Sequence, residues 1–330
     1  MMESSILVTG GAGYIGSHVV RQLGEAGERV VTLDNLSAGN REAVLYGAFV
    51  EGDTGDYDLV RQVILDHNVK TIMHFAAFTV VPESVSDPVK YYKNNTCNAL
   101  SLIKAATMTG VENFIFSSTA AVYGVVGENA VTEETPVEPI NPYGYSKLMT
   151  EQILADTAAA IDSFEYVALR YFNVAGADPE CRIGPNSGET LLLIKAACEV
   201  AVGKREKIYV FGDDYATPDG TGIRDYIHVE DIASAHLSTL KYLRQGGQST
   251  VMNCGYGHGY SVREVLDTVQ KVHGAPINIE QAPRREGDAP SVVANADKLR
   301  LRTGWQPSYD NLTTIVSNAL AWERSCVKKK

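Results

Sequence analysis

The sequence predicts an α/β fold of the Rossmann type, a doubly wound parallel sheet followed by a smaller C-terminal substrate-binding lobe. Short apolar, β-rich stretches alternate with helical patterns through the first half of the chain, and this alternation is typical of a parallel sheet with helices on both faces. A glycine-rich turn directly follows the first of these stretches. With 330 residues, the chain is long enough for a large core and a second lobe.

Each element follows from its own residues. Short apolar runs predict strands at residues 5–10, 29–35, 71–77, 113–118 and 166–173. Helical periodicity predicts helices at 16–27, 56–67, 90–109, from 141 onward, 190–202 and 261–273. From about residue 174 the chain is richer in Gly, Pro, Asp and Thr, as binding loops often are. We therefore expect a first domain over residues 1–173 and a second over 174–330, with some segments of the second returning to the first.

Composition excludes several classes of function. The net charge of −11 repels polyphosphate backbones, so we expect no binding to nucleic acid. No apolar stretch is long enough for a membrane span, and the N-terminus lacks a signal-peptide pattern. The five cysteines are scattered without a CxxC pair, which fits a reducing compartment and predicts a cytoplasmic protein without a metal site.

The glycine-rich turn predicts a dinucleotide site. Gly10, Gly13 and Gly16 follow the first strand and open a helix, so that backbone N–H groups at the helix N-terminus can approach a pyrophosphate. Asp34 ends the second predicted strand, where an acid binds a ribose 2′-hydroxyl and repels a 2′-phosphate. This favours NAD over NADP. Asp53 is open to two interpretations, a contact to the adenine edge or a simple turn aspartate.

A second group of residues has the chemistry for oxidising a hydroxyl. Ser117, Ser118 and Thr119 end a predicted parallel strand at its carboxyl end, where such folds place their ligands. On the next helix, Tyr143 and Lys147 are four residues apart and share a face. A hydroxyl can orient the substrate, the phenol can exchange a proton, and the ammonium is expected to lower the pKa of the phenol.

Together the motifs resemble those of a known family. "TGGAGYIGSH", "LDNLS", "HFAA", "FSSTAAVYG", "NPYGYSKLMTE", "RYFNVAGA", "FGDDYATPDGTGIRDYIHVEDIA" and "RREGD" occur in order along nearly the whole chain. They are similar to those of the UDP-glucose 4-epimerase family, within the extended short-chain dehydrogenases/reductases. The resemblance implies a homodimer that holds NAD tightly and epimerises C4 of a UDP-hexose through a 4-keto sugar.

The resemblance also assigns roles to residues. Tyr143 would remove the proton of the sugar 4-hydroxyl, Lys147 would hold the nicotinamide ribose, and Thr119 would hydrogen-bond the reacting oxygen. The implied cofactor-binding residues are Gly10, Gly13, Tyr14, Ile15, Gly16, Asp34, Asn35, Asp53, Phe75, Ala76 and Lys147. The implied substrate-binding residues are Thr119, Tyr143, Asn173, Phe211, Arg224, Arg285, Asp288 and Val292.

The sequence departs from the family pattern at three places. Thr79 stands where many members carry a lysine near the cofactor, and the stretch around Leu192 and Leu193 lacks the usual polar residue and proline. Val292 stands where a bulky tyrosine can restrict the sugar pocket. Valine leaves more room, so we expect tolerance of N-acetylhexosamines alongside plain hexoses, unless the region of Leu192 refills the space.

Two alternatives remain. A nucleotide-sugar dehydratase or decarboxylase could use the same scaffold, but a dehydratase requires an acid pair after the strand-end threonine, where this chain has Ala120 and Ala121. A non-catalytic NAD-sensing protein would not need the pair formed by Tyr143 and Lys147. Both alternatives are therefore less favoured than the epimerase.

Overall fold

The computed structural model describes residues 4–127, 129–185, 192–285 and 288–328, and its largest feature is a sheet of seven parallel strands. The strands lie in the order β3-β2-β1-β4-β5-β6-β11. They are β1 (Ser5–Thr9), β2 (Val30–Asp34), β3 (Ala48–Glu51), β4 (Val69–His74), β5 (Asn113–Thr119), β6 (Glu165–Tyr171) and β11 (Thr250–Cys254). The doubly wound Rossmann-type sheet predicted from the sequence is therefore confirmed.

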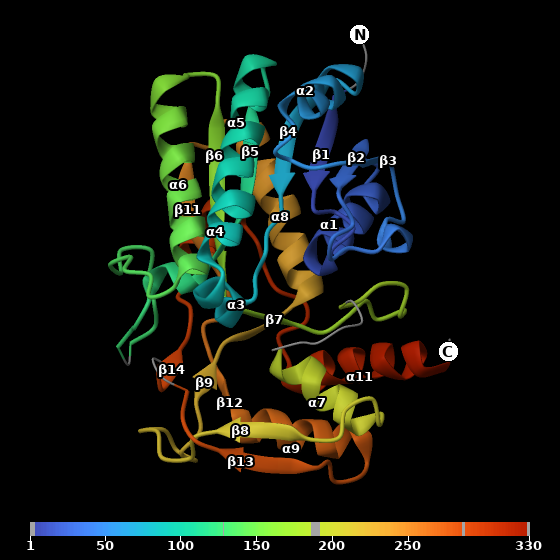
Figure 1. Cartoon of the computed structure of the whole chain (residues 1–330), viewed down its shortest axis with the longest axis vertical. Coiled ribbons are helices and arrows are strands. Elements are labelled where there is room, and N and C mark those ends of the chain that lie inside the picture. Colours follow the sequence, from blue (N-terminus) through green and yellow to red (C-terminus); the bar gives the residue numbers. More distant parts are fainter. Residues whose placement is uncertain (1–3, 128, 186–191, 286–287, 329–330) are drawn as a thin grey trace.

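The order of the strands creates a binding crevice. From β1 the chain continues through β2 and β3 on one side of the sheet, and then returns with β4 on the other side of β1. At such a switch point, the connections after the two adjacent strands diverge and leave a crevice outside their carboxyl ends. These ends face the smaller group of elements in the lower part of Figure 1.

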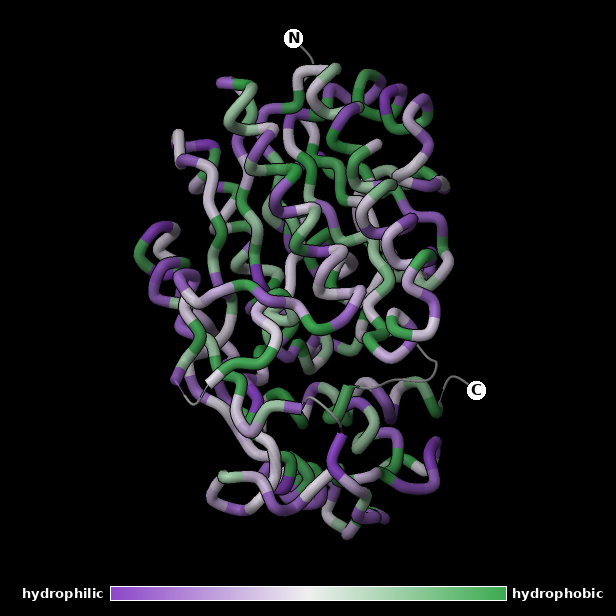
Figure 2. The backbone as a smooth tube through the Cα atoms, turned by 60° about the vertical axis from the view of Figure 1, so that its left-hand side comes forward, coloured by the Kyte–Doolittle hydropathy of each residue, from purple (hydrophilic) through white to green (hydrophobic). Residues whose placement is uncertain are grey.

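Helices cover both faces of the sheet. One face carries α2 (Tyr57–Asp66), α5 (Asn98–Met108) and α6 (Pro142–Ala160), and the other carries α1 (Tyr14–Glu25) and α8 (Val229–Arg244). Alternate strand residues point to opposite faces of the sheet. Phe114 and Phe116 pack in the apolar cluster on the face of α2, α5 and α6, and Ile115 packs in the cluster on the face of α1 and α8. Figure 2 shows hydrophobic stretches running through the interior of this part of the protein.

The smaller group of elements comes from the second half of the chain. Its helices are α7 (Leu193–Ala201), α9 (Val262–His273), α10 (Asp297–Thr303) and α11 (Leu312–Lys328). Short sheets pair β8 (Ile208–Phe211) with β13 (Ile279–Ala282), and join β9 (Ile223–Arg224) to β12 (Tyr260–Ser261) and β14 (Ser291–Val292). The second half also returns to the large sheet, through β11 at its edge and α8 against α1.

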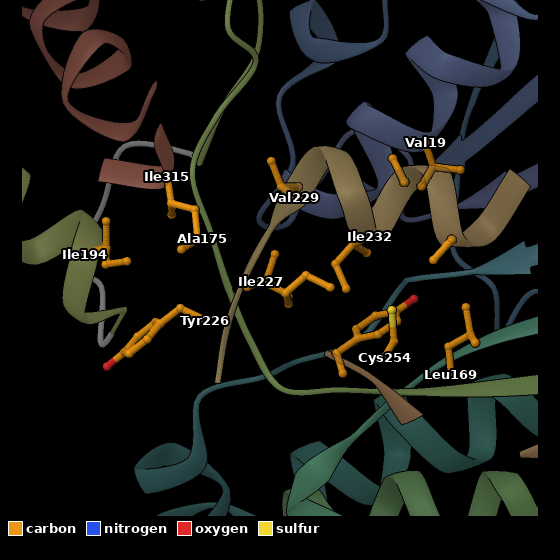
Figure 3. Packing of buried hydrophobic residues seen from close by; sticks show 14 of the residues in the cluster. Val19, Leu169, Ala175, Ile194, Tyr226, Ile227, Val229, Ile232, Cys254 and Ile315 are labelled. Carbon is orange, nitrogen blue, oxygen red and sulfur yellow. The ribbon is translucent and has the colours of Figure 1, made fainter. Parts of the chain in front are cut away.

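Two parallel strands, β7 (Asn173–Ala175) and β10 (Tyr226–His228), connect the two groups of elements. Their apolar residues pack with those of α8 and α7, as Ala175, Ile227 and Ile232 show in Figure 3. Asp225, beside β10, is fully buried and accepts hydrogen bonds from the backbone N–H groups of Tyr256 and Gly257 at 3.0 Å. This carboxylate fastens the loop after β11 to the strand that enters the second lobe.

Several predicted boundaries differ from the structure. The strand expected at 71–77 ends at His74, and the strand expected at 166–173 ends at Tyr171. The helix expected at 90–109 consists of α4 (Pro88–Tyr91), a π-helical segment (Tyr92–Cys97) and α5. Residues 190 and 191 of the helix expected at 190–202 lie outside the described residues. The remaining short elements are 3₁₀ turns at Arg41–Ala43 and Ala120–Tyr123, and α3 (Val81–Ser86).

Candidate active site

An open groove with about 560 Å³ of empty space lies at the ends of β1, β2 and β4. Gly10 has a φ of +71°, and a Cβ there would lie 2.5 Å from the backbone nitrogen of Ala76. Only glycine fits this close approach of the turn to the end of β4. The groove is lined by Gly10, Gly13, Leu33, Asp34, Asn35, Ser37, Ala38, Gly39, Gly52, Asp53, Thr54, Phe75, Ala76, Ala77, Phe78 and Asn94.

The two aspartates of the groove, Asp34 and Asp53, are held by hydrogen bonds. Asp34 accepts hydrogen bonds from the backbone N–H groups of Ala12 at 2.9 Å and Leu36 at 2.8 Å, and each carboxylate oxygen keeps a second lone pair for a ligand hydroxyl. Asp53 accepts from Asn35 and Asn98 at 2.9 and 2.8 Å. Asp53 thus has a clear structural role in its turn, although it also lines the groove.

Helix α1 begins at the groove. Gly13 is its N-cap and makes no side-chain capping bond, so the first N–H groups of the helix are suited to an anion. Phe75 and Ala76 line the groove after the end of β4. The side chain of Tyr14 instead donates to the Gly176 carbonyl at 2.6 Å, and Ile15 packs on the core. Contacts from Tyr14 and Ile15 to a cofactor would therefore come from the backbone, and the groove as a whole fits a dinucleotide.

Helix α6 brings Tyr143 to the end of β5. The side chain of Asn141 caps the helix by accepting from the Gly144 N–H at 2.9 Å, and Pro142 occupies the first turn. The Thr119 hydroxyl accepts from the Ala121 N–H at 3.1 Å, and its own proton is therefore available for the phenol of Tyr143. Burial raises the pKa of Tyr143, whereas the hydrogen bond with Thr119 lowers it.

The surroundings of Lys147 differ from the sequence-based expectation. Its buried Nζ donates to the Ser117 carbonyl at 2.8 Å and lies 4.9 Å from the centre of the Phe116 ring. Burial lowers the pKa of Lys147 to about 7, and the charge of Glu151 opposes this. We expected the ammonium to lower the pKa of Tyr143, but burial dominates that pKa and Thr119 is the group that lowers it.

The three hydroxyls at the end of β5 have separate partners. The Thr119 hydroxyl lowers the pKa of the neighbouring Tyr143, and the Ser117 hydroxyl lowers that of Tyr171. Ser118 is buried and donates to Glu151, on the side of the strand away from both. The expectation that Ser118 could face the cofactor is therefore wrong, because successive side chains of a strand point to opposite faces.

Most of the expected substrate-binding residues meet in the second lobe. The Arg285 guanidinium lies 3.9 Å from the centre of the Phe211 ring, and Arg224 forms an ion pair with Asp288. Val292 pairs with Arg224 in the register of β14 and β9. Residues 286 and 287 of the "RREGD" motif lie outside the described residues.

Asn173 lies beside a second cavity, with about 460 Å³ of empty space. Leu192, Leu193 and Tyr226 line it together with Asn173, so the stretch that departs from the family pattern does contribute to a wall there. Thr79 is exposed in the loop after β4. Among the residues that the structure describes, no cluster of His, Cys, Asp and Glu is arranged to hold a metal ion.

Two groups near the site were not found from the sequence. Tyr171, in the "RYFN" motif, and His236 on α8 are hydrogen-bonded at 2.5 Å in a buried position. Glu151 is bound by Arg170 at 2.6 and 3.0 Å behind Lys147. The spacing of Tyr143, Lys147 and Glu151 at successive fourth positions on one helix was a usable signal for Glu151. The sequence carried no comparable signal for His236.

A parallel sheet with a dinucleotide groove at its switch point, beside a tyrosine–lysine pair, defines an NAD(P)-binding protein of the short-chain dehydrogenase/reductase type. The model of the NAD dependent epimerase/dehydratase family matches residues 6–255. A UDP-glucose 4-epimerase of Azospirillum brasilense is 53% identical over 321 residues, which cover 97% of this chain and 92% of that protein. The chain therefore belongs to the NAD dependent epimerase/dehydratase family, in its UDP-glucose 4-epimerase branch.

Solved structures agree with this assignment. The UDP-glucose 4-epimerase of Bifidobacterium longum, in complex with NAD+ and UDP, superposes with a TM-score of 0.92 at 38% identity, covering 98% of both chains. The UDP-Glc/GlcNAc 4-epimerase of Campylobacter jejuni superposes with a TM-score of 0.87 at 48% identity, covering 98% of this chain and 100% of that one. In the described part of the chain, no helix has the length and apolar character needed to cross a membrane.

Proposed function

We propose that this protein interconverts UDP-glucose and UDP-galactose by inverting C4 of the sugar, with NAD as a tightly held cofactor. The observation that carries the proposal is the buried Lys147, which donates to the Ser117 carbonyl at 2.8 Å and stands one turn after Tyr143 on α6, in a protein with a dinucleotide groove at its strand ends. The match to the UDP-glucose 4-epimerases over nearly the whole chain supports the same activity.

In this proposal Tyr143 exchanges the proton of the sugar 4-hydroxyl. The Thr119 oxygen already accepts the Ala121 N–H, so its proton can be donated to the phenol or to the reacting sugar oxygen. Bound NAD supplies a hydride acceptor that serves as the donor later in the same turnover. Lys147, held at the Ser117 carbonyl, would bind the nicotinamide ribose.

The nucleotide anchor would come from the second lobe. Phe211 offers a flat face for the uracil, while Arg224 and Arg285 offer cations for the diphosphate. Asp288 and Asn173 would hold the ribose and the diphosphate region. Anchoring the nucleotide and not the hexose is what inversion requires, because the 4-keto sugar must turn between the two hydride transfers.

The test is the conversion of UDP-galactose by the purified protein, followed by NMR of the anomeric proton. We expect UDP-glucose to appear, and a Tyr143→Phe variant to lose about 10²- to 10⁴-fold in kcat while it retains NAD. A dehydratase or decarboxylase would give a different product, and a non-catalytic NAD sensor would give none. Either result would overturn the epimerase proposal.

We further propose that N-acetylated UDP-hexosamines are substrates. Val292 is a small side chain beside Arg224, and the similar Campylobacter jejuni enzyme is a UDP-Glc/GlcNAc 4-epimerase. Incubation with UDP-N-acetylgalactosamine should therefore give UDP-N-acetylglucosamine. A Val292→Tyr variant should lose this activity and keep the conversion of UDP-galactose. If the wild-type protein converts UDP-galactose alone, the idea fails and the wall at Leu192 becomes the candidate filler.

We also propose a cytoplasmic homodimer. Leu100 on α5, and Tyr145 and Met149 on α6, expose 52%, 43% and 43% of their surface on neighbouring helices, and such apolar groups are typical of an interface. Light scattering should give twice the mass of the chain, and Met149→Lys should weaken the association. The exposed Leu301 on α10 is the matched control, since Leu301→Lys should leave the mass unchanged.

A further inference from the structure

His236 lies next to the candidate active site and contacts two residues there, Phe75 and Tyr171. It is a fully buried residue of α8. Its ring packs on Phe75, a residue of the dinucleotide groove, with the ring centres 4.8 Å apart. Its Nε2 lies 2.5 Å from the hydroxyl oxygen of Tyr171, the last residue of β6. His236 therefore connects a residue of the dinucleotide groove with the strand end that lies next to Thr119.

The direction of the hydrogen bond between His236 and Tyr171 follows from the other ring nitrogen. Burial lowers the pKa of His236 to about 4, so the ring is neutral at neutral pH and carries a single N–H. Nδ1 lies 2.8 Å from the Ile232 carbonyl, which can only accept. The proton is therefore on Nδ1, and Nε2 accepts the hydroxyl proton of Tyr171.

This bond has two consequences for the reacting groups. With its proton given to His236, the oxygen of Tyr171 can only accept, and the neighbouring Ser117 hydroxyl lowers the pKa of Tyr171. Ser117 is also the residue whose carbonyl holds the ammonium of Lys147, at 2.8 Å. Ser117 therefore stands between Tyr171 on β6 and Lys147 on α6, with its hydroxyl beside the first and its carbonyl bound to the second.

We infer that His236 is a positioning residue, which fixes Lys147 through Tyr171 and Ser117 and keeps Tyr171 from acting as a second proton donor beside Tyr143. This inference rests on the proposed epimerase function. Because Tyr171 lies opposite Thr119 in the register of β5 and β6, its hydroxyl is close to the phenol that must exchange the proton. If Tyr171 is held as an acceptor, Tyr143 is the phenol left to exchange the proton.

The experiment is a double-mutant cycle that measures kcat, the dissociation constant for NAD and the thermal midpoint. His236→Phe keeps the ring against Phe75 but removes the acceptor, and Tyr171→Phe removes the hydroxyl. Each should lower kcat about tenfold, because Lys147 is held less firmly once the bond between His236 and Tyr171 is lost. The double variant should lose no more than either single variant, because both remove the same bond. His236→Gln, which restores an acceptor near the position of Nε2, should recover most of kcat.

The matched control is Thr239→Val, since Thr239 is a buried residue of α8 whose hydroxyl donates to the carbonyl of Ala235 in its own helix, at 2.8 Å. It should lower the thermal midpoint and leave kcat unchanged. His236→Phe should leave the NAD dissociation constant within about twofold of wild type, because the packing on Phe75 remains. Effects that multiply in the double variant, or a fall in kcat for Thr239→Val equal to that of His236→Phe, would overturn the inference. If the wild-type protein does not epimerise, it is the proposed function that fails.

Discussion

Replacing Glu151 by glutamine should be among the most destabilising single changes in the helices that cover the large sheet. Glu151 and Arg170 expose 5% and 6% of their side chains, and the guanidinium bonds both carboxylate oxygens at 3.0 and 2.6 Å. Removing the negative charge leaves the arginine buried and uncompensated, which costs about 3–5 kcal/mol. Given the unfolding entropy typical per residue, a loss of about 3 kcal/mol should lower the thermal midpoint of a chain of this length by about 4 °C.

The assay is thermal and urea unfolding followed by circular dichroism, with two comparison variants. Glu280→Gln breaks an ion pair with Lys207 in which the glutamate is 46% exposed, so it should cost less than about 1 kcal/mol. A double variant, Glu151→Met with Arg170→Met, removes both charges and should regain most of the loss. A loss below about 1 kcal/mol for Glu151→Gln, or no recovery in the double variant, would refute the reasoning that an uncompensated charge is the cause.

Three further outcomes are expected. Gly10→Ala should abolish NAD retention, because its Cβ would lie 2.5 Å from a backbone atom. Gly27 has a φ of +83° and no neighbour within 4 Å of an added Cβ, so Gly27→Ala should cost only about 1–2 kcal/mol of conformational strain and keep NAD. Equal NAD content in the two variants would contradict this expectation. Asp34→Asn should lower the ratio of the NADP to the NAD dissociation constant about tenfold, measured by calorimetric titration, because a negative charge no longer repels a 2′-phosphate. Burial lowers the pKa of Lys147 to about 7, and Glu151 raises it. The value of kcat/KM should therefore fall as the pH rises through about 7, and Glu151→Gln should move this fall to lower pH. An unshifted pH profile would argue against a role for the ammonium.

The parts of the fold that the sequence predicted are those determined locally. The glycine turn after β1 and the start of α6 at Asn141 and Pro142 are set by conformational demands within a few residues. The break of the helix expected at 90–109 was not predicted, because it depends on distant contacts. In its π-helical segment, the Asn95 side chain holds the backbone of Phe78 and the Ser146 hydroxyl, at 2.9 and 3.0 Å.

The candidate site also has features that the local sequence predicts and features that depend on distant contacts. Tyr143 and Lys147 could be placed on one face from their spacing, but their partners could not, because burial and the Ser117 carbonyl decide where the ammonium lies. The period of two along a strand is a local signal that separates Ser118 from Ser117 and Thr119. The return of β11 and α8 to the large sheet, which brings His236 beside Tyr171, is a long-range event without a local pattern.

The way α6 meets β5 explains how so few residues fix the reacting groups. Tyr143, Lys147 and Glu151 occupy successive turns of one helix face. Lys147 donates to the Ser117 carbonyl, Glu151 accepts from the Ser118 hydroxyl, and Tyr143 neighbours Thr119. Gly144 permits this contact, because a Cβ there would lie 2.7 Å from the Ala121 carbonyl oxygen. The helix and the strand therefore cannot slide past each other without breaking both hydrogen bonds. It follows that the buried pair of Glu151 and Arg170 helps to maintain the register of α6, with Tyr143 and Lys147, against the end of β5.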